Sequence, residues 1–222
     1  MQVGSLAFYK EFAMADMKIY ALEVGMIRTN CYLILNEESH EMIIVDPGDD
    51  ADLICEKIRQ LDGRPVAIFL THGHYDHILG VNDLREAYPE IEVFIGEKDA
   101  AMLKDDSLNC DCYGTRITVE PDHLVSEGTL IELAGFHCAV MHTPGHTAGS
   151  VCYYYEEQGV LFAGDTLFFR SYGRTDLPTG NNREMVMSLT RLLTELPDDV
   201  TVLCGHDRST TIGYEKRVKG FQ

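Results

Sequence analysis

The chain's most chemically dense stretch is the motif His-Gly-His-Tyr-Asp-His at residues 72–77, which places three imidazoles and one carboxylate within six residues. That density is too high for a role in packing alone. Neutral imidazole nitrogens and carboxylate oxygens bind divalent first-row metals such as zinc, iron and manganese. The motif therefore predicts a metal site whose first candidate ligands are His72, His74, Asp76 and His77.

Three further candidate ligands follow at long range, each directly after a glycine. They are His146 in Thr143-Pro-Gly-His-Thr-Ala-Gly149, Asp165 in Ala163-Gly-Asp-Thr166, and His206 after Gly205. Together with the dense motif they make five imidazoles and two carboxylates, a set typical of a two-metal site.

The other histidines have ordinary interpretations. We interpret His40, His123 and His137 as surface or core residues with no part in the site. His142 lies four residues before His146, but Pro144-Gly145 breaks any helix that would align the two side chains, so we interpret it as structural.

Strands and helices alternate around the candidate ligands. Strands are expected at 19–24, 31–35, 42–46, 67–70, 93–95, 129–133, 136–141, 151–155, 160–163 and 202–204, and helices at 51–61, 78–88, 97–103 and 183–196. Asp76 and His77 would open the helix after the strand at 67–70, while His146 and Asp165 would follow other strands. We expect sheets whose ends converge on one metal cleft, in a layered α/β architecture with helices on the outer faces.

Charge and hydropathy limit the partners. The chain has 222 residues, and 18 basic against 36 acidic residues give a formal net charge of −18. That field opposes polyanions, so no nucleic-acid partner is expected. No apolar run approaches the roughly 18 residues that span a bilayer, and residues 1–16 lack the features of a secretory signal, so a cytoplasmic location is expected. Residues 1–16 are interpreted as an N-terminal extension or a non-native remnant, and 17–222 as a single domain.

The seven cysteines are odd in number and scattered, which does not suggest a disulfide framework. Cys110-Asp-Cys112 could bind metal or act in redox chemistry, but one such pair without a second carries little weight. The surrounding segment, 97–128, is polar. It is interpreted either as a lid or rim over the cleft or as a solvated loop.

The ordered motifs HxHxDH, TPGHTxGS, AGDTLF and GH resemble the metallo-β-lactamase superfamily from about Met17 to the C-terminus. The resemblance implies a four-layer αββα sandwich. It places His72, His74 and His146 on one metal, Asp76, His77 and His206 on a second, and Asp165 between the two. Residues 173–178 (GRTDLP) and 210–215 (TTIGYE) look like those of the short glyoxalase-II-like hydrolases.

This resemblance implies a hydrolase with two divalent ions, zinc or else iron or manganese. A hydroxide bridging them would attack a small acyl-thiol substrate such as S-lactoylglutathione. Asp76 would also orient the hydroxide, and Asp46 would hold a ligand histidine. Arg174 is the candidate for binding a substrate carboxylate, whereas Arg170 and Lys216 are interpreted as ordinary salt-bridge residues.

Two features depart from the glyoxalase II pattern. Those enzymes carry an additional helical C-terminal domain, whereas only residues 207–222 follow His206 here. The usual GHGP around the last ligand is Gly205-His-Asp-Arg208, which adds two charges beside the cleft.

Three alternatives stay open. Persulfide dioxygenases share the fold and a GRTD signature, and would use one iron held by His72, His146 and Asp165. Leu177-Pro178 and the lack of an added sulfur-transfer domain favour the hydrolase.

Lactonase or β-lactamase activity would use the same two-metal centre. A non-catalytic metal-binding module is the third alternative, and the complete ligand set argues against it. The sequence does not indicate the oligomeric state.

Overall fold

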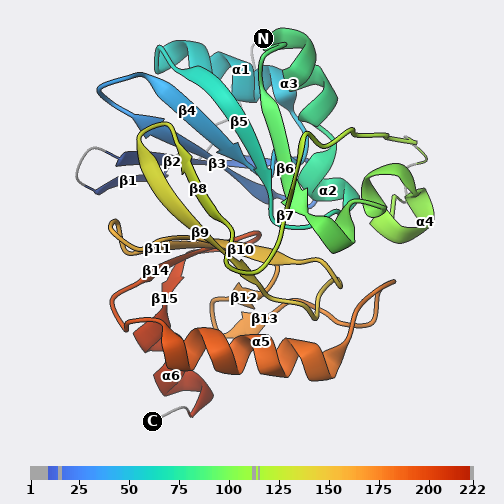
Figure 1. Cartoon of the computed structure of the whole chain (residues 1–222), viewed down its shortest axis with the longest axis vertical. Coiled ribbons are helices and arrows are strands. Elements are labelled where there is room, and N and C mark those ends of the chain that lie inside the picture. Colours follow the sequence, from blue (N-terminus) through green and yellow to red (C-terminus); the bar gives the residue numbers. More distant parts are fainter. Residues whose placement is uncertain (1–9, 15–16, 112–113, 115, 221–222) are drawn as a thin grey trace, which may run out of the picture.

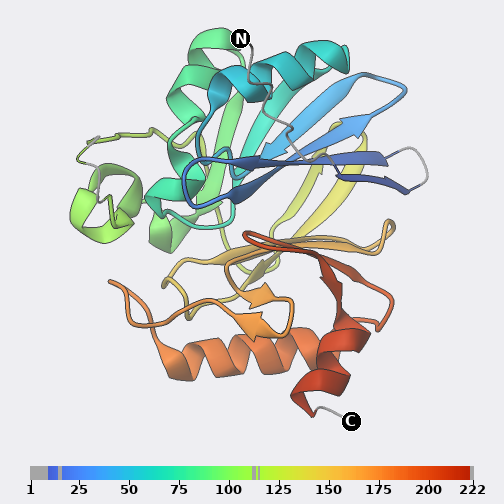
Figure 2. The same cartoon turned by 180° about the vertical axis from the view of Figure 1, so that it is seen from behind.

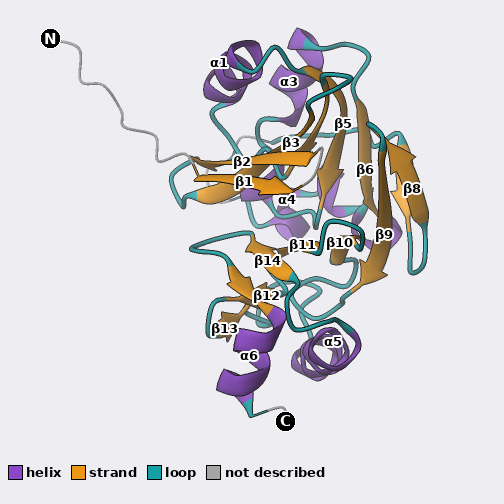
Figure 3. Cartoon of the chain, turned by 90° about the vertical axis from the view of Figure 1, so that its left-hand side faces the viewer, coloured by secondary structure: helices purple, strands orange, loops and turns teal. Residues whose placement is uncertain are grey.

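The computed structural model describes residues 10–14, 17–111, 114 and 116–220. Within these residues two large sheets lie face to face, and helices cover the outer face of each (Figure 1). Figure 3 shows the same layers from the side, with helices above and below the strands. This four-layer αββα arrangement confirms the fold class expected from the sequence.

The first sheet has the strand order β1-β2-β3-β4-β5-β6-β7. Its strands are β1 (Lys10–Met14), β2 (Met17–Val24), β3 (Thr29–Asn36), β4 (Glu41–Val45), β5 (Arg64–Leu70), β6 (Glu92–Gly96) and β7 (His123–Val125). Strands β1 to β4 pair antiparallel, and β4 to β7 pair parallel. The antiparallel hairpins at the β1 edge face the viewer in Figure 2. Strand β1 lies within residues 1–16, which the sequence analysis interpreted as an extension ahead of the domain.

The second sheet has the order β15-β14-β11-β10-β9-β8. Its strands are β8 (Leu130–Leu133), β9 (Phe136–His142), β10 (Val151–Tyr155), β11 (Val160–Gly164), β14 (Thr201–Cys204) and β15 (Thr210–Thr211). Only β11 and β14 pair parallel. A separate hairpin is formed by β12 (Leu167–Phe168) and β13 (Ser171–Tyr172).

Three apolar layers separate the four structural layers. Strand β3 contributes to two of these apolar layers, because successive side chains of a strand point to opposite faces of the sheet. Leu33 packs with Ile54 of helix α1 (Ala51–Gln60) on the outer side, while Ile34 packs with Phe162 of β11 between the sheets. The third layer joins the second sheet to helices α5 (Asn182–Glu195) and α6 (Ile212–Lys219).

Two expected helices are wrong in their extent. The helix expected at 78–88 is divided into α2 (Tyr75–Ile78) and α3 (Val81–Ala87). The backbone N–H of Gly80 donates to the Pro47 carbonyl at 2.9 Å, and a Cβ at Gly80 would lie 2.9 Å from that oxygen. This tertiary contact interrupts the helical pattern.

The helix expected at 97–103 forms instead two 3-10 turns, Glu97–Asp99 and Met102–Lys104. The following segment contains α4 (Asp106–Asn109) and strand β7, neither of which was expected. The other unexpected elements are β1, β12, β13, β15 and α6. Among the described residues, no helix is both long and apolar enough to cross a bilayer.

Candidate metal centre

The candidate ligands all lie where strands end. His72 and His74 follow β5, Asp76 and His77 lie in α2, His146 lies between β9 and β10, Asp165 follows β11, and His206 follows β14. Strand β5 belongs to the first sheet, and β9, β11 and β14 belong to the second. The structure therefore brings the seven side chains together at one end of the sandwich, with both sheets contributing.

The side chains form three overlapping groups of possible ligands. We name two of them the histidine group (His72, His74 and His146) and the mixed group (Asp76, His77 and His206), and the third, made of His72, His77 and Asp165, joins these two. Within each group the potential ligand atoms lie within 4.8 Å of one another. In the histidine group, His74 Nδ1 lies 2.9 Å from His146 Nε2. In the mixed group, Asp76 Oδ2 lies 3.4 Å from His77 Nε2 and 3.3 Å from His206 Nε2.

Asp165 lies between the two groups. Its Oδ2 is 3.5 Å from Nε2 of His146, in the histidine group, and 3.6 Å from Nε2 of His206, in the mixed group. Its Oδ1 is 3.5 Å from Nε2 of His77, in the mixed group. One carboxylate therefore faces both groups, as a bridging ligand would.

Four of the ligand-type atoms are buried and lack hydrogen-bond partners among the described residues. His72 Nε2, His74 Nε2, His77 Nε2 and Asp165 Oδ1 are buried and make no hydrogen bond to another described residue. Buried polar atoms normally have hydrogen-bond partners, since leaving one unsatisfied costs about 1–3 kcal/mol. Imidazole and carboxylate donors left open in this way fit divalent first-row cations.

The two groups differ in their electrostatics. Burial, with the neighbouring His146, lowers the pKa of His74 to about 3, so its imidazole is neutral near pH 7. A neutral imidazole is the form that binds metal. In the mixed group, burial alone would lower the pKa of His77, but the carboxylates of Asp76, Asp46 and Asp165 raise it to about 10. Negative charge is thus concentrated where a cation would neutralise it.

Two contacts fix the direction of candidate ligands. Asp46 accepts hydrogen bonds from the backbone N–H and the hydroxyl of Thr71 (2.8 and 2.7 Å), and its Oδ2 lies 3.0 Å from His77 Nδ1. The structure thus places Asp46 beside a candidate ligand histidine, as the sequence predicted. His146 Nδ1 lies 2.7 Å from the backbone carbonyl of Arg174, which leaves Nε2 facing Asp165.

Asp99, which the sequence reasoning missed, joins the two loops that carry the histidine group. Its Oδ2 accepts from the backbone N–H of Gly73 at 3.2 Å and from the Thr147 hydroxyl at 2.6 Å. Its Oδ1 accepts from the N–H of Gly149 at 2.7 Å. Asp99 is fully buried, and no spacing pattern in the sequence marks it. The sequence feature that could have drawn attention to Asp99 is its position just after β6, the strand that pairs with β5.

The other predicted residues lie outside the cluster. His40, His123 and His137 lie at the surface beside carboxylates, and His142 Nε2 lies 2.9 Å from the Ala148 carbonyl. Lys216 forms a salt bridge with Asp198, as expected of an ordinary surface lysine.

The guanidinium of Arg174 makes two hydrogen bonds of 2.7 Å to Asp176, so its role in substrate binding stays a prediction. Cys110 is partly buried, whereas Cys112 lies outside the described residues.

Comparison with known proteins gives the family. Residues 24–206 match the model of the metallo-beta-lactamase superfamily. Hydroxyacylglutathione hydrolase GloC of Haemophilus influenzae is 34% identical, over 92% of this chain and 98% of its own. The crystal structure of BLEG-1 B3 metallo-beta-lactamase matches with TM-score 0.84 and 37% identity, covering 90% of this chain and 96% of that one. That of TTHA1623 in a di-iron-bound form matches with TM-score 0.80 and 33% identity, covering 91% and 99%. The chain belongs to the metallo-β-lactamase superfamily.

Proposed function

Because the chain belongs to this superfamily of metal-dependent hydrolases, we propose that it is a two-metal hydrolase that cleaves an acyl thioester. The observation that carries the proposal is the position of Asp165, whose carboxylate lies within 3.6 Å of ring nitrogens of both ligand groups. A single-metal site would need a carboxylate facing only one group. The di-iron form of TTHA1623 supports two ions per chain and leaves iron beside zinc and manganese as the candidate metals.

In this proposal the histidine group would hold one ion and the mixed group would hold the other, and Asp165 would contribute a ligand oxygen to the site. When bound, two divalent ions would lower the pKa of water toward neutrality and polarise the acyl carbonyl. The side chains of the protein would position the metal ligands and the attacking water. Asp76, which accepts a hydrogen bond of 3.2 Å from the Thr29 hydroxyl, would accept a second from the attacking water and orient it.

Buried contacts hold this arrangement before a substrate arrives. Asp46 Oδ2 lies 3.0 Å from Nδ1 of His77, and the Arg174 carbonyl lies 2.7 Å from Nδ1 of His146, which leaves Nε2 of His146 facing the centre. Such partners of metal-binding histidines commonly set metal affinity and ring orientation. The protein needs no side-chain nucleophile in this mechanism.

The name of GloC supports a glutathione thioester as the first substrate to test, while BLEG-1 supports a β-lactam as the second. The test measures hydrolysis of S-lactoylglutathione and of a chromogenic cephalosporin by the purified, metal-loaded protein. We expect thioester cleavage to exceed cephalosporin cleavage. The Asp165→Asn variant should lose the activity, whereas His137→Ala, a surface control, should retain it.

Three results would overturn the proposal in different directions. Faster cephalosporin cleavage would identify a β-lactamase. Oxygen uptake with glutathione persulfide and one iron per chain would identify a persulfide dioxygenase. Bound metal without any of these activities would favour a non-catalytic module.

A further inference from the structure

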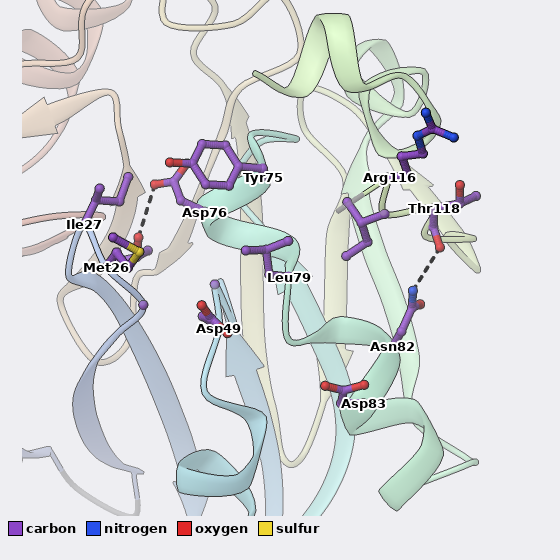
Figure 4. Close-up of a pocket in the computed structure, with 14 residues that line it drawn as sticks. Met26, Ile27, Asp49, Tyr75, Asp76, Leu79, Asn82, Asp83, Arg116 and Thr118 are labelled. Carbon is purple, nitrogen blue, oxygen red and sulfur yellow. Dashed lines mark hydrogen bonds between the residues drawn. The ribbon is translucent and has the colours of Figure 1, made fainter. Parts of the chain in front are cut away.

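A cavity of about 490 Å³ opens beside the mixed group (Figure 4). Asp76 forms part of its wall, together with Thr29, whose hydroxyl donates to the Asp76 carboxylate. Ligand pockets commonly have volumes of roughly 300–1,000 Å³. The cavity is therefore large enough for part of a substrate whose reacting carbonyl lies at the metal centre.

Part of the cavity wall is apolar. The turn between β2 and β3 contributes Met26 and Ile27, helix α2 contributes Tyr75, and Leu79 and Ile117 complete the apolar lining. In Figure 4, Met26 and Ile27 lie at the left, Leu79 lies in the middle, and Arg116 and Thr118 lie at the right. Met26 is 79% exposed and Ile27 is 48% exposed, although both side chains are large and apolar. Exposed apolar side chains gathered at a cavity indicate a binding surface.

The charges of the cavity are mostly negative. Besides the candidate ligand Asp76, two aspartates line it, Asp49 and Asp83, with Arg116 as the cation. The Asn82 amide donates to the Thr118 carbonyl at 3.0 Å, so that amide is already used within the wall. Glutathione carries two carboxylates, which these aspartates would repel. The thiol-bearing part of a glutathione thioester is thus disfavoured here, whereas an uncharged acyl group is compatible.

We infer that this cavity binds the acyl group of the thioester, and that the preferred acyl group is an apolar chain or ring larger than lactoyl. The inference rests on the proposed function and assigns its substrate class. Met26 and Ile27 act as specificity-determining residues, since they form the exposed apolar wall. A lactoyl group would leave most of this wall in contact with water, whereas a longer chain would cover it.

The test compares kcat/KM for S-acetyl-, S-butanoyl-, S-hexanoyl- and S-octanoylglutathione. Each methylene that enters the cavity should raise kcat/KM about three- to fourfold, until the cavity is filled. The double variant Met26→Ser/Ile27→Ser should flatten this increase. Both side chains are exposed, so the variant should fold. Met187→Ser removes a 63% exposed methionine from helix α5 and should leave the increase unchanged.

A second measurement separates failure of the inference from failure of the proposed function. Calorimetry with S-methyl-, S-hexyl- and S-octylglutathione, which have no acyl carbonyl to cleave, reports binding alone. Affinity that rises with chain length but no cleavage of any thioester would support the apolar cavity and contradict the proposed hydrolase. Thioester cleavage with no dependence on acyl length would overturn the inference and leave the hydrolase intact. Equal affinities for all three thioethers would also overturn the inference.

Discussion

Asp99 offers a specific test of how the fold prepares the metal centre. Its buried carboxylate accepts three hydrogen bonds, two of them from Gly73 and Thr147, which are direct neighbours of candidate ligands. In Asp99→Asn the amide nitrogen replaces an accepting oxygen, so at least one of the three donors loses its acceptor. Each buried donor left unsatisfied costs about 1–3 kcal/mol, so the free energy of unfolding should fall by at least that amount.

The same change should weaken metal binding, because the loops that carry His72, His74 and His146 lose their common anchor. Replacing a residue that orients metal ligands typically lowers metal affinity about 10- to 100-fold. Urea unfolding of the metal-free protein would measure stability. Competition with a fluorescent zinc chelator would measure affinity, without any need for catalysis.

Glu215 provides the matched control. It is also a fully buried carboxylate, and it accepts from the Arg170 N–H at 3.0 Å and from the Thr210 hydroxyl at 2.7 Å, but neither residue adjoins a candidate ligand. Glu215→Gln should lower stability and leave zinc affinity unchanged. An equal loss of zinc affinity in both variants would refute a specific role for Asp99. So would unchanged affinity in Asp99→Asn.

Three further predictions concern other parts of the molecule. A Cβ at Gly205 would lie 2.2 Å from Asp165 Oδ1, so Gly205→Ala should lose bound metal while circular dichroism stays native; full metal content by elemental analysis would contradict this. The hydrogen bonds from Arg191 lower the pKa of Glu127 below its usual 4.5, so this pair stabilises the fold above that pH and loses its effect as pH falls through the lowered pKa. Because Glu127 is half exposed, Glu127→Gln should cost at most about 1 kcal/mol at pH 7, and urea unfolding should show a difference that shrinks on acidification; a difference that grows would contradict the assignment. Leu192 is buried in the apolar layer between α5 and the second sheet, so Leu192→Ala should lower the free energy of unfolding in urea by about 2–5 kcal/mol without changing metal content. A decrease below about 1 kcal/mol would mean that the layer repacks around the smaller side chain.

Much of the candidate centre could be predicted from the sequence because its chemistry is local. Residues 72–77 alone supply four of the seven candidate ligands, and the chain holds them at the end of β5, where the apolar run predicts a strand. His146, Asp165 and His206 each follow a glycine at or just beyond a strand end. Long amphipathic elements such as α1 and α5 were predicted to within about two residues, since their periodicity decides their structure.

The contacts that position the ligands could not be predicted, because they depend on the tertiary structure. Asp99 lies 48 residues from Thr147 in the sequence, and nothing in its neighbourhood indicates that the two meet. The backbone carbonyl of Arg174, rather than its guanidinium, faces His146, and a sequence pattern carries no information about a carbonyl. The interruption between α2 and α3 at Gly80 has the same origin, since it depends on the approach of Pro47.

The central claim is that the seven side chains hold two metal ions per chain. The most direct measurement is calorimetric titration of zinc into the metal-free protein, with elemental analysis of the product. We expect two ions per wild-type chain, and fewer in Asp165→Ala, because that change removes a carboxylate that faces both ligand groups. One ion per wild-type chain at saturation would contradict the account, as would two tightly bound ions in the variant.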